Sequence, residues 1–456
     1  MTRELAIGFD FGTSNSAMAV AEPGESGARL LRLDPTAPRS THIPTALYLE
    51  RDGAARIGYD AIQAVVAAEA GRRIVRQRQA TGQYIDTLVG LGPQAVWTDV
   101  DVSQPGRFFQ SLKSFLADRS FRGTNVFGRY YTMEDLIATI MRAMRLRAEE
   151  EVGRPITRAT VGRPVHWAEG DPKKDALALR RMETALEAAG FATFDFVPEP
   201  IAAGLHFAAT LPAPRNVVVF DFGGGTLDVT VMRIGGGERA VLSTGGIPLG
   251  GNTLDEEIMD QRLLAHFGQD LRWGPQDLPM PNHILDSIRR WYTIPDLNEP
   301  RTLAFLENLE RETAGAARRQ ARALLALVRG NHGWPLFREI ERAKIGLSDR
   351  ASERIAYGAD AIAIDEPLPR RAFEALIEAR VRQAERCLDG ALAAAALEPG
   401  QIDAVVRTGG SSAIPRFQRL LAAKFGADKL RFQDAFTSVV TGLAFSAADR
   451  IADSAA

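Results

Sequence analysis

Apolar and polar positions predict the same local structure at two places in the chain. LAIGFDFG and NVVVFDFG are apolar runs that each lead into a turn rich in glycine and hydroxyl residues, and SAMAVAE and LDVTVMRI follow those turns. Apolar, β-prone runs on both sides of a short turn are typical of a β-hairpin. Both copies contain FDFG, and Asp10 and Asp221 lie 211 residues apart. The pattern therefore predicts two equivalent hairpins.

Helices and further strands follow each hairpin. MEDLIATIMRAMRLRAEEEVG has helical spacing and ends at Gly153, and DPKKDALALRRMETALEAAG has a helix cap at Asp171, Pro172 in the first helical position and a stop at Gly190. We also predict helices over RQAERCLDGALAAAAL and PRFQRLLAAKFG, and strands over ARLLRLD, TALYLE, RATVGRPV and DAVVRTGG.

The order of these elements repeats, which indicates an internal duplication. Two such halves predict an α/β architecture with two similar lobes and a cleft between them. The pattern changes between about Gln269 and Arg342, where WGPQDLPMPNH has the composition of a loop and RETAGAARRQARALLALVRG has that of an exposed basic helix. We interpret the arginines of this helix as a solvated face, and a docking surface is the alternative.

Composition narrows the class of protein. The 456 residues are 45% hydrophobic and 25% charged, with a formal net charge of −2, so no global field favours nucleic acid or an anionic membrane. Cys387 is the single cysteine, which excludes an internal disulfide and fits a reducing compartment. The chain shows no signal-peptide pattern and no apolar run of roughly 20 residues. We therefore expect a cytoplasmic protein with no membrane and no nucleic-acid partner.

The two turns carry the residue types that a phosphate site needs. Glycines at Gly12 and at Gly223–Gly225 let the backbone approach a ligand closely, and successive N–H groups form an anion-binding concavity. Hydroxyl groups add further donors, and a strand-end Asp is a hard oxygen ligand for Mg²⁺. One such hairpin is a common feature, but two copies predict that both sides of one phosphate are held. A protein kinase is excluded, because no VAIK or HRD motif accompanies DFG.

Seven motifs in order resemble those of the seventy-kilodalton heat-shock protein (DnaK-type) family. They are IGFDFGTSNSAMAV, TVGRPVHW, VPEPIAAGLHF, VVVFDFGGGTLDVTV, PLGGNTLDEEI, REIERAKIGLS and VVRTGGSSAIPRFQRLL. The nearest type is the YegD-like members, which have the ATPase domain and little else. The resemblance implies an α/β actin-like ATPase fold, with two ribonuclease-H-like lobes around a nucleotide cleft. Lobe I would be 1–211 completed by 431–456, and lobe II would be 212–430 with an elaborated helical subdomain at about 254–375.

The resemblance also implies ATP or ADP and Mg²⁺ as ligands, slow ATP hydrolysis, and a role for each matched residue. Asp10 and Asp221 would hold Mg²⁺ through its waters, and Lys113, Glu199, Asp228 and Thr226 would form the catalytic group. The phosphates would lie against Gly12, Thr13, Ser14, Gly223, Gly224, Gly225, Gly250 and Gly251. The adenosine would lie against Glu341, Lys344, Ile345, Ser348, Gly409, Gly410 and Ser411.

The chain departs from the family pattern at the base and at its end. Ile345 and Ala413 stand where the family has arginines that pack on the adenine, and Phe436 stands near a family Asp. The base preference therefore stays open. The chain stops at LAFSAADRIADSAA, so we expect no peptide-binding domain and an unknown protein partner or client. Three alternatives to an ATPase also stay open, namely a nucleotide-sensing scaffold, a filament-forming actin relative and a small-molecule kinase.

Overall fold

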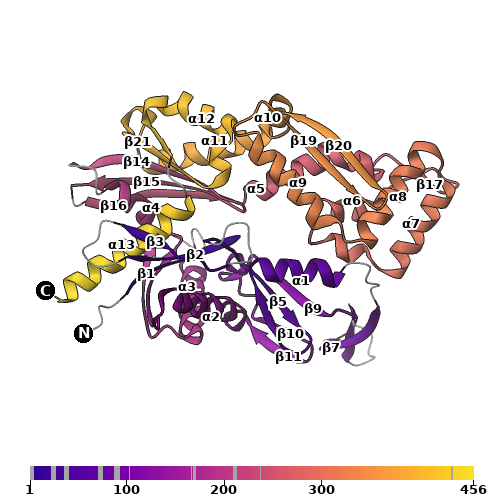
Figure 1. Ribbon diagram of the computed structural model, residues 1–456, viewed down its shortest axis with the longest axis horizontal. Coiled ribbons are helices and arrows are strands. Elements are labelled where there is room, and N and C mark those ends of the chain that lie inside the picture. Colours follow the sequence, from indigo (N-terminus) through magenta and orange to yellow (C-terminus); the bar gives the residue numbers. More distant parts are fainter. Residues whose placement is uncertain are drawn as a thin grey trace. The chain divides into compact units, whose positions relative to one another are not determined.

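The fold of the chain is described from a computed structural model (Figure 1). The structure describes residues 5–21, 27–34, 41–69, 75–86, 93–101, 103–165, 167, 171–208, 213–236, 238–432 and 435–455. The chain divides into a first compact unit, Met1–Ala64, Phe108–Leu254 and Glu374–Ala456, and a second, Val65–Arg107 and Asp255–Phe373. This division is by compactness, so the predicted lobes at 1–211 and 212–430 stay a prediction.

Two sheets of the first unit share one strand plan. The first has the order β13 (Thr193–Pro198), β12 (Arg158–Arg163), β1 (Ala6–Phe11), β2 (Asn15–Ala21) and β3 (Ala28–Leu30), with β4 (Ile43–Pro44) also paired to β2. The second has the order β22 (Leu430–Phe432), β21 (Ala404–Thr408), β14 (Arg215–Phe222), β15 (Leu227–Gly235) and β16 (Glu238–Ile247). In both, the first three strands run parallel and the last two antiparallel. The predicted duplication is confirmed.

The two FDFG stretches occupy equivalent places in these sheets. β1 and β2 form an antiparallel hairpin in which Asp10 lies opposite Ala17, and β14 and β15 form another in which Asp221 lies opposite Asp228. Each aspartate is followed by one more residue of its strand and then by the turn. Both predicted hairpins are therefore confirmed, and each places its aspartate at the same end of its sheet.

Helices cover both faces of the first sheet. Ile7, Phe9 and Phe11 of β1 are buried in one core with α2 (Met133–Val152) and α3 (Pro172–Ala189). Alternate side chains of a strand point to opposite faces, so the small residues of β1 face α13 (Ala435–Ala455), and Ala6 packs with Ala444 there. α13 also packs against α4 (Glu199–Ala208). The predicted helix signals are confirmed, with Asp171 capping α3 and glycines ending α2 and α3.

Other elements complete the first unit or cross between the two units. The first unit also contains β5 (Ala46–Glu50), β6 (Ala55–Ile57), β10 (Gly123–Val126), β11 (Arg129–Thr132), α11 (Glu378–Ala394) and α12 (Pro415–Phe425). The predicted helices at α11 and α12 are confirmed. Four elements run across a chain boundary of the units, namely α1 (Tyr59–Glu69), β9 (Gly106–Gln110), α5 (Gly251–Ile258) and α10 (Arg370–Leu376).

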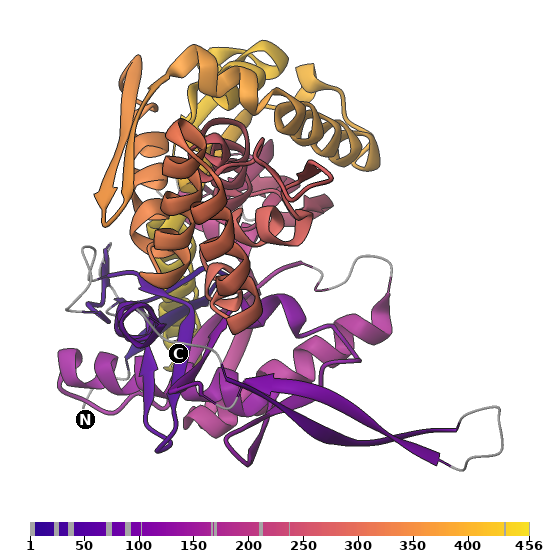
Figure 2. The same cartoon turned by 90° about the vertical axis from the view of Figure 1, so that its right-hand side faces the viewer.

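The second unit is mostly helical. It contains α6 (Asn282–Ile288), α7 (Pro300–Glu312), α8 (Gly315–Arg329) and α9 (Gly333–Gly346), with strand pairs β7 (Arg76–Asp86) with β8 (Pro93–Asp101) and β19 (Ser352–Ala359) with β20 (Ile362–Pro369). β19 packs on α9 and β20 on α8, and Figure 2 shows this orange hairpin upright beside the helices of its unit. The predicted basic helix is confirmed as α8, whose Arg318, Arg319 and Arg322 are exposed.

Two predictions from local pattern need correction. WGPQDLPMPNH, predicted as a loop, begins with the last residue of β17 (Arg272–Trp273) and contains its partner strand β18 (Leu278–Pro279) and the start of α6. The Trp273 indole donates to the Pro279 carbonyl at 3.0 Å, a contact that no periodicity encodes. The strand predicted over ARLLRLD is also shorter, since β3 ends at Leu30.

Candidate functional site

The turns of the two FDFG hairpins lie against each other in the first unit. Gly12 donates its N–H to Ser16 Oγ at 3.2 Å, and a methyl group at this position would lie only 2.1 Å from the Asn15 carbonyl oxygen, so the turn accepts no side chain. A methyl group at Gly224 would lie 3.3 Å from Ser14 Oγ. The structure therefore brings the predicted hydroxyl residues of the first turn next to the glycines of the second.

The predicted glycine loops of the second sheet are joined by hydrogen bonds. The N–H of Gly251 donates to the Gly223 carbonyl at 3.0 Å, and Ser411 Oγ donates to the same carbonyl at 3.0 Å. A methyl group at Gly250 would lie 2.3 Å from the Gly224 carbonyl oxygen, which leaves no room for a side chain. Loops that are far apart in sequence, including Gly409–Ser411, are thus held side by side, and glycine turns of this kind can form anion-binding concavities.

A buried lysine and a glutamate form an ion pair near the first hairpin. Lys113 lies in the 3-10 turn η1 (Leu112–Phe115) and is buried, and its Nζ donates to Glu199 Oε1 at 2.7 Å. Glu199 is the first residue of α4. Burial alone would lower the pKa of Lys113, but the nearby Glu199 and Asp10 carboxylates outweigh it, so the pKa is raised and the amine stays charged.

The carboxylates around this pair have raised pKa values. Burial, followed by the charge of Glu199, raises the pKa of Asp10 to about 7. Burial also raises the pKa of Asp221, although Thr408 Oγ1 donates to Asp221 Oδ1 at 2.6 Å and opposes the shift. Burial and Asp221 raise the pKa of Asp228 to about 7. The Asp228 side chain is open to solvent, so water offsets part of its shift.

The charge balance of this group fits a cation. Asp10, Glu199, Asp221 and Asp228 interact electrostatically, and Lys113, which forms an ion pair with Glu199, favours the charged form of the three aspartates. Among the residues that the structure describes, no three Asp, Glu, His or Cys side chains are close enough to coordinate a metal ion directly. Four carboxyl groups near one lysine have the chemistry to hold a hydrated Mg²⁺ ion, which Asp10 and Asp221 would contact through its waters.

A cavity of about 210 Å³ opens beside these groups. Glu199, Asp221 and Asp228 line it, together with Thr230 and Thr244 of the second sheet. The cavity has room for several water molecules. Carboxylates that face such a space are placed to orient water.

Two further residues of the site were not predicted from the sequence. Thr408 donates to Asp221, and it ends a strand just before a glycine turn, which is the signal that identified the two aspartates. The Trp167 ring lies 5.6 Å from Lys113 Nζ and provides a cation–π contact. Trp167 closes the TVGRPVHW motif, but no spacing linked it to the lysine.

Thr226 donates to Asp228 Oδ2 at 2.9 Å, so these two predicted residues do contact each other.

The predicted adenosine residues belong to both units. Glu341, Lys344 and Ile345 lie on α9, with Ser348 just after it, whereas Gly409–Ser411 belong to the first unit. A shared adenosine site therefore stays a prediction. Lys344 is buried and its Nζ donates to Asp255 Oδ2 at 2.8 Å. Burial raises the pKa of Asp255 to about 6, although Lys344 opposes the shift.

The raised pKa of Asp10 predicts how stability depends on pH without Mg²⁺ and nucleotide. Its pKa is about 7 in the folded chain and near 3.8 in the unfolded chain, so between these values the folded state holds a proton that the unfolded state has lost. This contribution to stability is present below pH 3.8 and is lost as pH rises through 7. The unfolding free energy of the wild type should fall between pH 5 and 8, and in Asp10→Asn this fall should be smaller by about 2 kcal/mol.

Urea unfolding of both proteins at pH 5, 6, 7 and 8 measures this difference. Asp349→Asn, which removes an exposed carboxylate, is the control and should leave the pH dependence as it is in the wild type. An Asp10→Asn curve parallel to that of the wild type would show that Asp10 ionises normally in the folded chain.

Comparison with known proteins identifies the family. The family model described as "Hsp70 protein" matches residues 6–273 and 334–450. The chain is 27% identical over 449 residues to a "Chaperone protein HscA homolog" of Azotobacter vinelandii (strain DJ / ATCC BAA-1303), covering 98% of this chain and 58% of that protein. It is 28% identical over 432 residues to "Heat shock 70 kDa protein BIP3" of Oryza sativa subsp. japonica, covering 92% and 52%. Because the family match spans more than half of the chain, the chain belongs to the Hsp70 family.

Family membership confirms the predicted fold class, and it supports ATPase activity in general. The fold is the mixed α/β, actin-like ATPase fold, and Hsp70 proteins are ATP-binding ATPases of the chaperone type. The chain spans just over half the length of the two relatives, at 58% and 52%. In the described part of the chain, no helix is both long and apolar enough to cross a membrane.

Proposed function

We propose that this chain binds ATP with Mg²⁺ and hydrolyses it slowly at the site between its two hairpins. One observation carries the proposal. Two sheets with the same strand plan each contribute an aspartate and a turn, and the buried Lys113–Glu199 pair lies beside them. Phosphoryl transfer to water depends on positioning and on electrostatic stabilisation, and this group contains a cation, carboxylates and backbone donors for both.

The residues divide the work of hydrolysis between them. Asp10 and Asp221 would hold Mg²⁺ through its waters, and the ion would neutralise charge on the phosphate oxygens. The turns at Gly12–Ser14 and Gly223–Thr226, with Gly250 and Gly251, would line the phosphates, and the hydroxyl groups of Thr13 and Ser14 would donate hydrogen bonds to them.

The remaining groups act on the attacking water. Lys113 would contact the γ-phosphate, and Glu199 would fix the lysine and orient the water. Asp228 would accept a proton of the water, with Thr226 holding that carboxylate at 2.9 Å. Two of these contacts exist in the first unit, namely Lys113 with Glu199 and Thr226 with Asp228.

One observation favours weak recognition of the base. Ile345 stands where the family has an arginine and is 54% exposed, and its side chain has neither a charge nor a hydrogen-bond donor. A cation–π contact is worth about 0.5–2 kcal/mol, so its loss lowers affinity roughly two- to thirtyfold. This keeps a nucleotide-sensing scaffold with little hydrolysis as the second candidate function, and hydrolysis under single-turnover conditions separates the two.

Lobe movement and a partner complete the proposal. We propose that lobe I, residues 1–211 with 431–456, and lobe II, residues 212–430, close around the nucleotide, since closure of domains on a ligand is a common switching mode. An unidentified protein partner or client would respond to that change, with Mg-ATP and Mg-ADP favouring different states.

Nucleotide binding should raise the melting temperature of the chain. At about 100 times its dissociation constant, a ligand that binds the folded state alone adds about 2.7 kcal/mol of stability. Thermal melts with millimolar ATP, ADP, GTP or CTP, each with and without Mg²⁺, measure this gain. We expect the largest rise with ATP or ADP plus Mg²⁺ and a small difference between ATP and GTP. No rise with any nucleotide would contradict the proposed function.

A further inference from the structure

A groove of about 650 Å³ lies within the second unit, and none of the residues assigned to the phosphates lines it. One side is the start of β20, with Ile362, Ala363 and Ile364, and the other is α8, with Arg319 and Arg322. Its volume is in the range of ligand pockets, although it is open along the strand. The groove is therefore apolar on the side of the strand and basic on the side of the helix.

The outer edge of β20 faces away from β19 with unpaired backbone groups. Arg262 Nη2 donates to the Pro367 carbonyl at 3.2 Å, so this carbonyl points away from β19. The backbone N–H and C=O groups of successive residues in a strand point to opposite sides of it. The groups of Ala363 and Asp365 therefore point away from β19, as the Pro367 carbonyl does. In the described part of the chain, β20 pairs only with β19. These two residues can thus accept and donate hydrogen bonds to an added strand.

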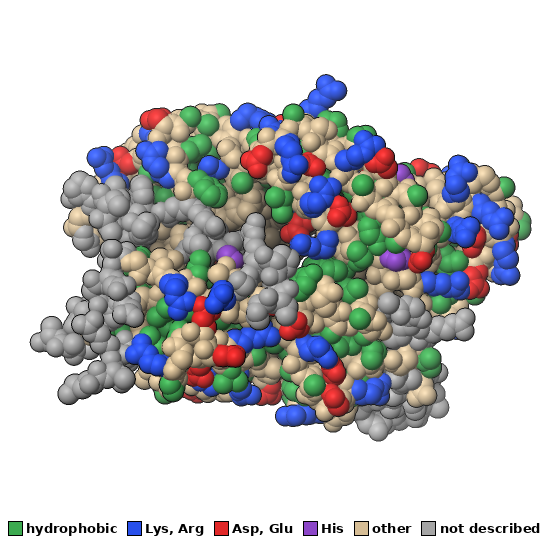
Figure 3. All heavy atoms as spheres, viewed as in Figure 1, with side chains coloured by type: hydrophobic (Ala, Val, Ile, Leu, Met, Phe, Trp, Pro, Cys, Tyr) green, Lys and Arg blue, Asp and Glu red, His purple; other side chains and the backbone are tan. Residues whose placement is uncertain are grey.

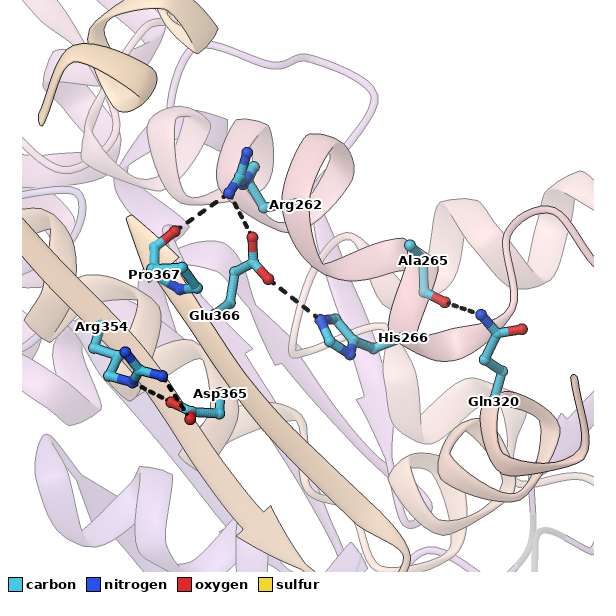
Figure 4. A network of polar contacts seen from close by, with 8 residues as sticks. All are labelled: Arg262, Ala265, His266, Gln320, Arg354, Asp365, Glu366 and Pro367. Carbon is cyan, nitrogen blue, oxygen red and sulfur yellow. Dashed lines mark hydrogen bonds and ion pairs between the residues drawn. The ribbon is translucent and has the colours of Figure 1, made fainter. Parts of the chain in front are cut away.

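The far end of this edge is held in place by a polar network that Figure 4 shows. Glu366 points from β20 towards the turns η2 (Met259–Leu263) and η3 (Leu264–Phe267), where it pairs with Arg262 Nη2 at 2.5 Å and His266 Nε2 at 3.7 Å. Gln320 of α8 donates to the Ala265 carbonyl at 2.9 Å. Strand, turns and helix are therefore fixed together, and the edge is preformed.

The free charge in the groove is positive. Arg319 and Arg322 of α8 line it and are exposed, and Figure 3 shows Lys and Arg side chains, with some Asp and Glu among them, at the right-hand end of the view. Among the described residues Arg319 has no ion pair or hydrogen bond, and the ion pair of Arg322 with Glu310 is long, at 3.9 Å. Among the described residues that line the groove, Asp360 is the one acidic side chain, and it is bound to His332 Nε2 at 2.8 Å. An acidic ligand therefore meets unpaired arginine.

We propose that β20 and α8 dock an extended acidic segment of a partner protein, which adds to the outer edge of β20 as a third strand. Its backbone pairs with Ala363 and Asp365, and its acidic side chains meet Arg319 and Arg322. Strand addition takes affinity from backbone hydrogen bonds and specificity from alternate side chains. Edges that avoid such pairing are short or charged. Pro367 and the Glu366 network protect the far end of this one, and the charge of Asp365 is paired with Arg354 Nη2 at 2.7 Å.

The probes are two fluorescein-labelled peptides, one alternating valine with glutamate over seven residues and its lysine counterpart, and the readout is fluorescence anisotropy with the full chain. We expect the glutamate peptide to bind at least about tenfold more tightly than the lysine peptide. A glutamate peptide with methyl groups on alternate amide nitrogens should lose about tenfold, because it cannot form the same backbone bonds. This comparison needs no variant of the protein.

Variants locate the binding. Ala363→Pro removes an outward N–H that β19 does not use, and should weaken binding about tenfold. Ala356→Pro is the matched control. Ala356 lies opposite Asp365, so its N–H points outward from β19, and the substitution removes the same kind of group from the outer edge of β19 and leaves the edge of β20 as it is. Arg319→Glu with Arg322→Glu should weaken binding about tenfold or more, whereas Arg386→Glu, an exposed arginine of α11, should not.

Three results would overturn the proposal. Equal binding of the glutamate and lysine peptides would remove the charge argument. Full binding by the methylated peptide would mean that arginine attracts the peptide without strand addition. Self-association of the unliganded chain that Ala363→Pro abolishes would show that a second copy occupies the edge.

Discussion

Glu199→Gln is expected to slow single-turnover ATP hydrolysis about 100-fold or more while leaving ATP affinity within about threefold of the wild type. Glu199 Oε1 accepts a hydrogen bond from Lys113 Nζ at 2.7 Å, and it lines the cavity beside Asp221 and Asp228. The neutral amide is nearly the same shape, but it cannot attract a proton of the water or hold the lysine by charge. The loss therefore falls on the transition state and spares the bound nucleotide.

Rapid mixing of excess enzyme with labelled ATP measures the hydrolysis rate, and nucleotide titration measures affinity. Glu187→Gln on α3 is the matched control, since Glu187 is exposed and lies in the same unit. Its rate should equal that of the wild type. A Glu199→Gln protein that loses binding and hydrolysis in equal proportion would mean that Glu199 supports the structure of the site and takes no part in the reaction.

Gly442→Ala is expected to destabilise the chain by about 3 kcal/mol. A methyl group at Gly442 of α13 would lie 1.9 Å from the carbonyl oxygen of Ala202 on α4, and 2.6 Å from its carbonyl carbon. These are backbone atoms, so no side-chain rotation relieves the overlap. The two helices would have to move apart, and α13 also packs on β1, which carries Asp10. The same substitution should therefore weaken Mg-ATP binding.

Gly390→Ala in α11 is the matched control, because nothing lies within 4 Å of the added methyl group. Alanine in a helix interior is more favourable than glycine by about 0.5–1 kcal/mol, so this variant should be slightly more stable than the wild type. Chemical unfolding followed by circular dichroism measures both variants. Equal stability of Gly442→Ala and Gly390→Ala would contradict the close crossing of α4 and α13.

Much of the fold could be predicted because local signals agree with it. The two FDFG hairpins, the cap at Asp171 and the glycine that ends α3 follow from alternation and helix-end chemistry. Where the sequence did not predict the structure, long-range contacts decide. The strands β17 and β18 are two residues each, too short to leave a pattern. The β19–β20 hairpin was not predicted either, although β20 has a strand pattern. Buried and exposed residues alternate along it, with Ile362, Ile364 and Leu368 buried and Ala363 and Asp365 exposed.

The site was predictable to different degrees. Asp10 and Asp221 follow from their place at strand ends, and Thr408 has the same signal. Lys113 had no local signal. It lies in a 3-10 turn that follows Ser111 in the left-handed region, and its partner is 86 residues away. Contacts of that kind depend on the packing of α4 against the first sheet, which no local pattern contains.

Release of phosphate from ATP by the purified wild-type chain, under single-turnover conditions with and without Mg²⁺, tests the central claim most directly. The predicted result is slow, complete conversion of bound ATP to ADP with Mg²⁺, and at least about 100-fold slower conversion in EDTA or in the Asp10→Asn, Asp221→Asn double variant. ATP that binds with Mg²⁺ and stays intact, or hydrolysis that persists at the same rate in the double variant, would contradict a shared Mg²⁺–phosphate site between the two hairpins.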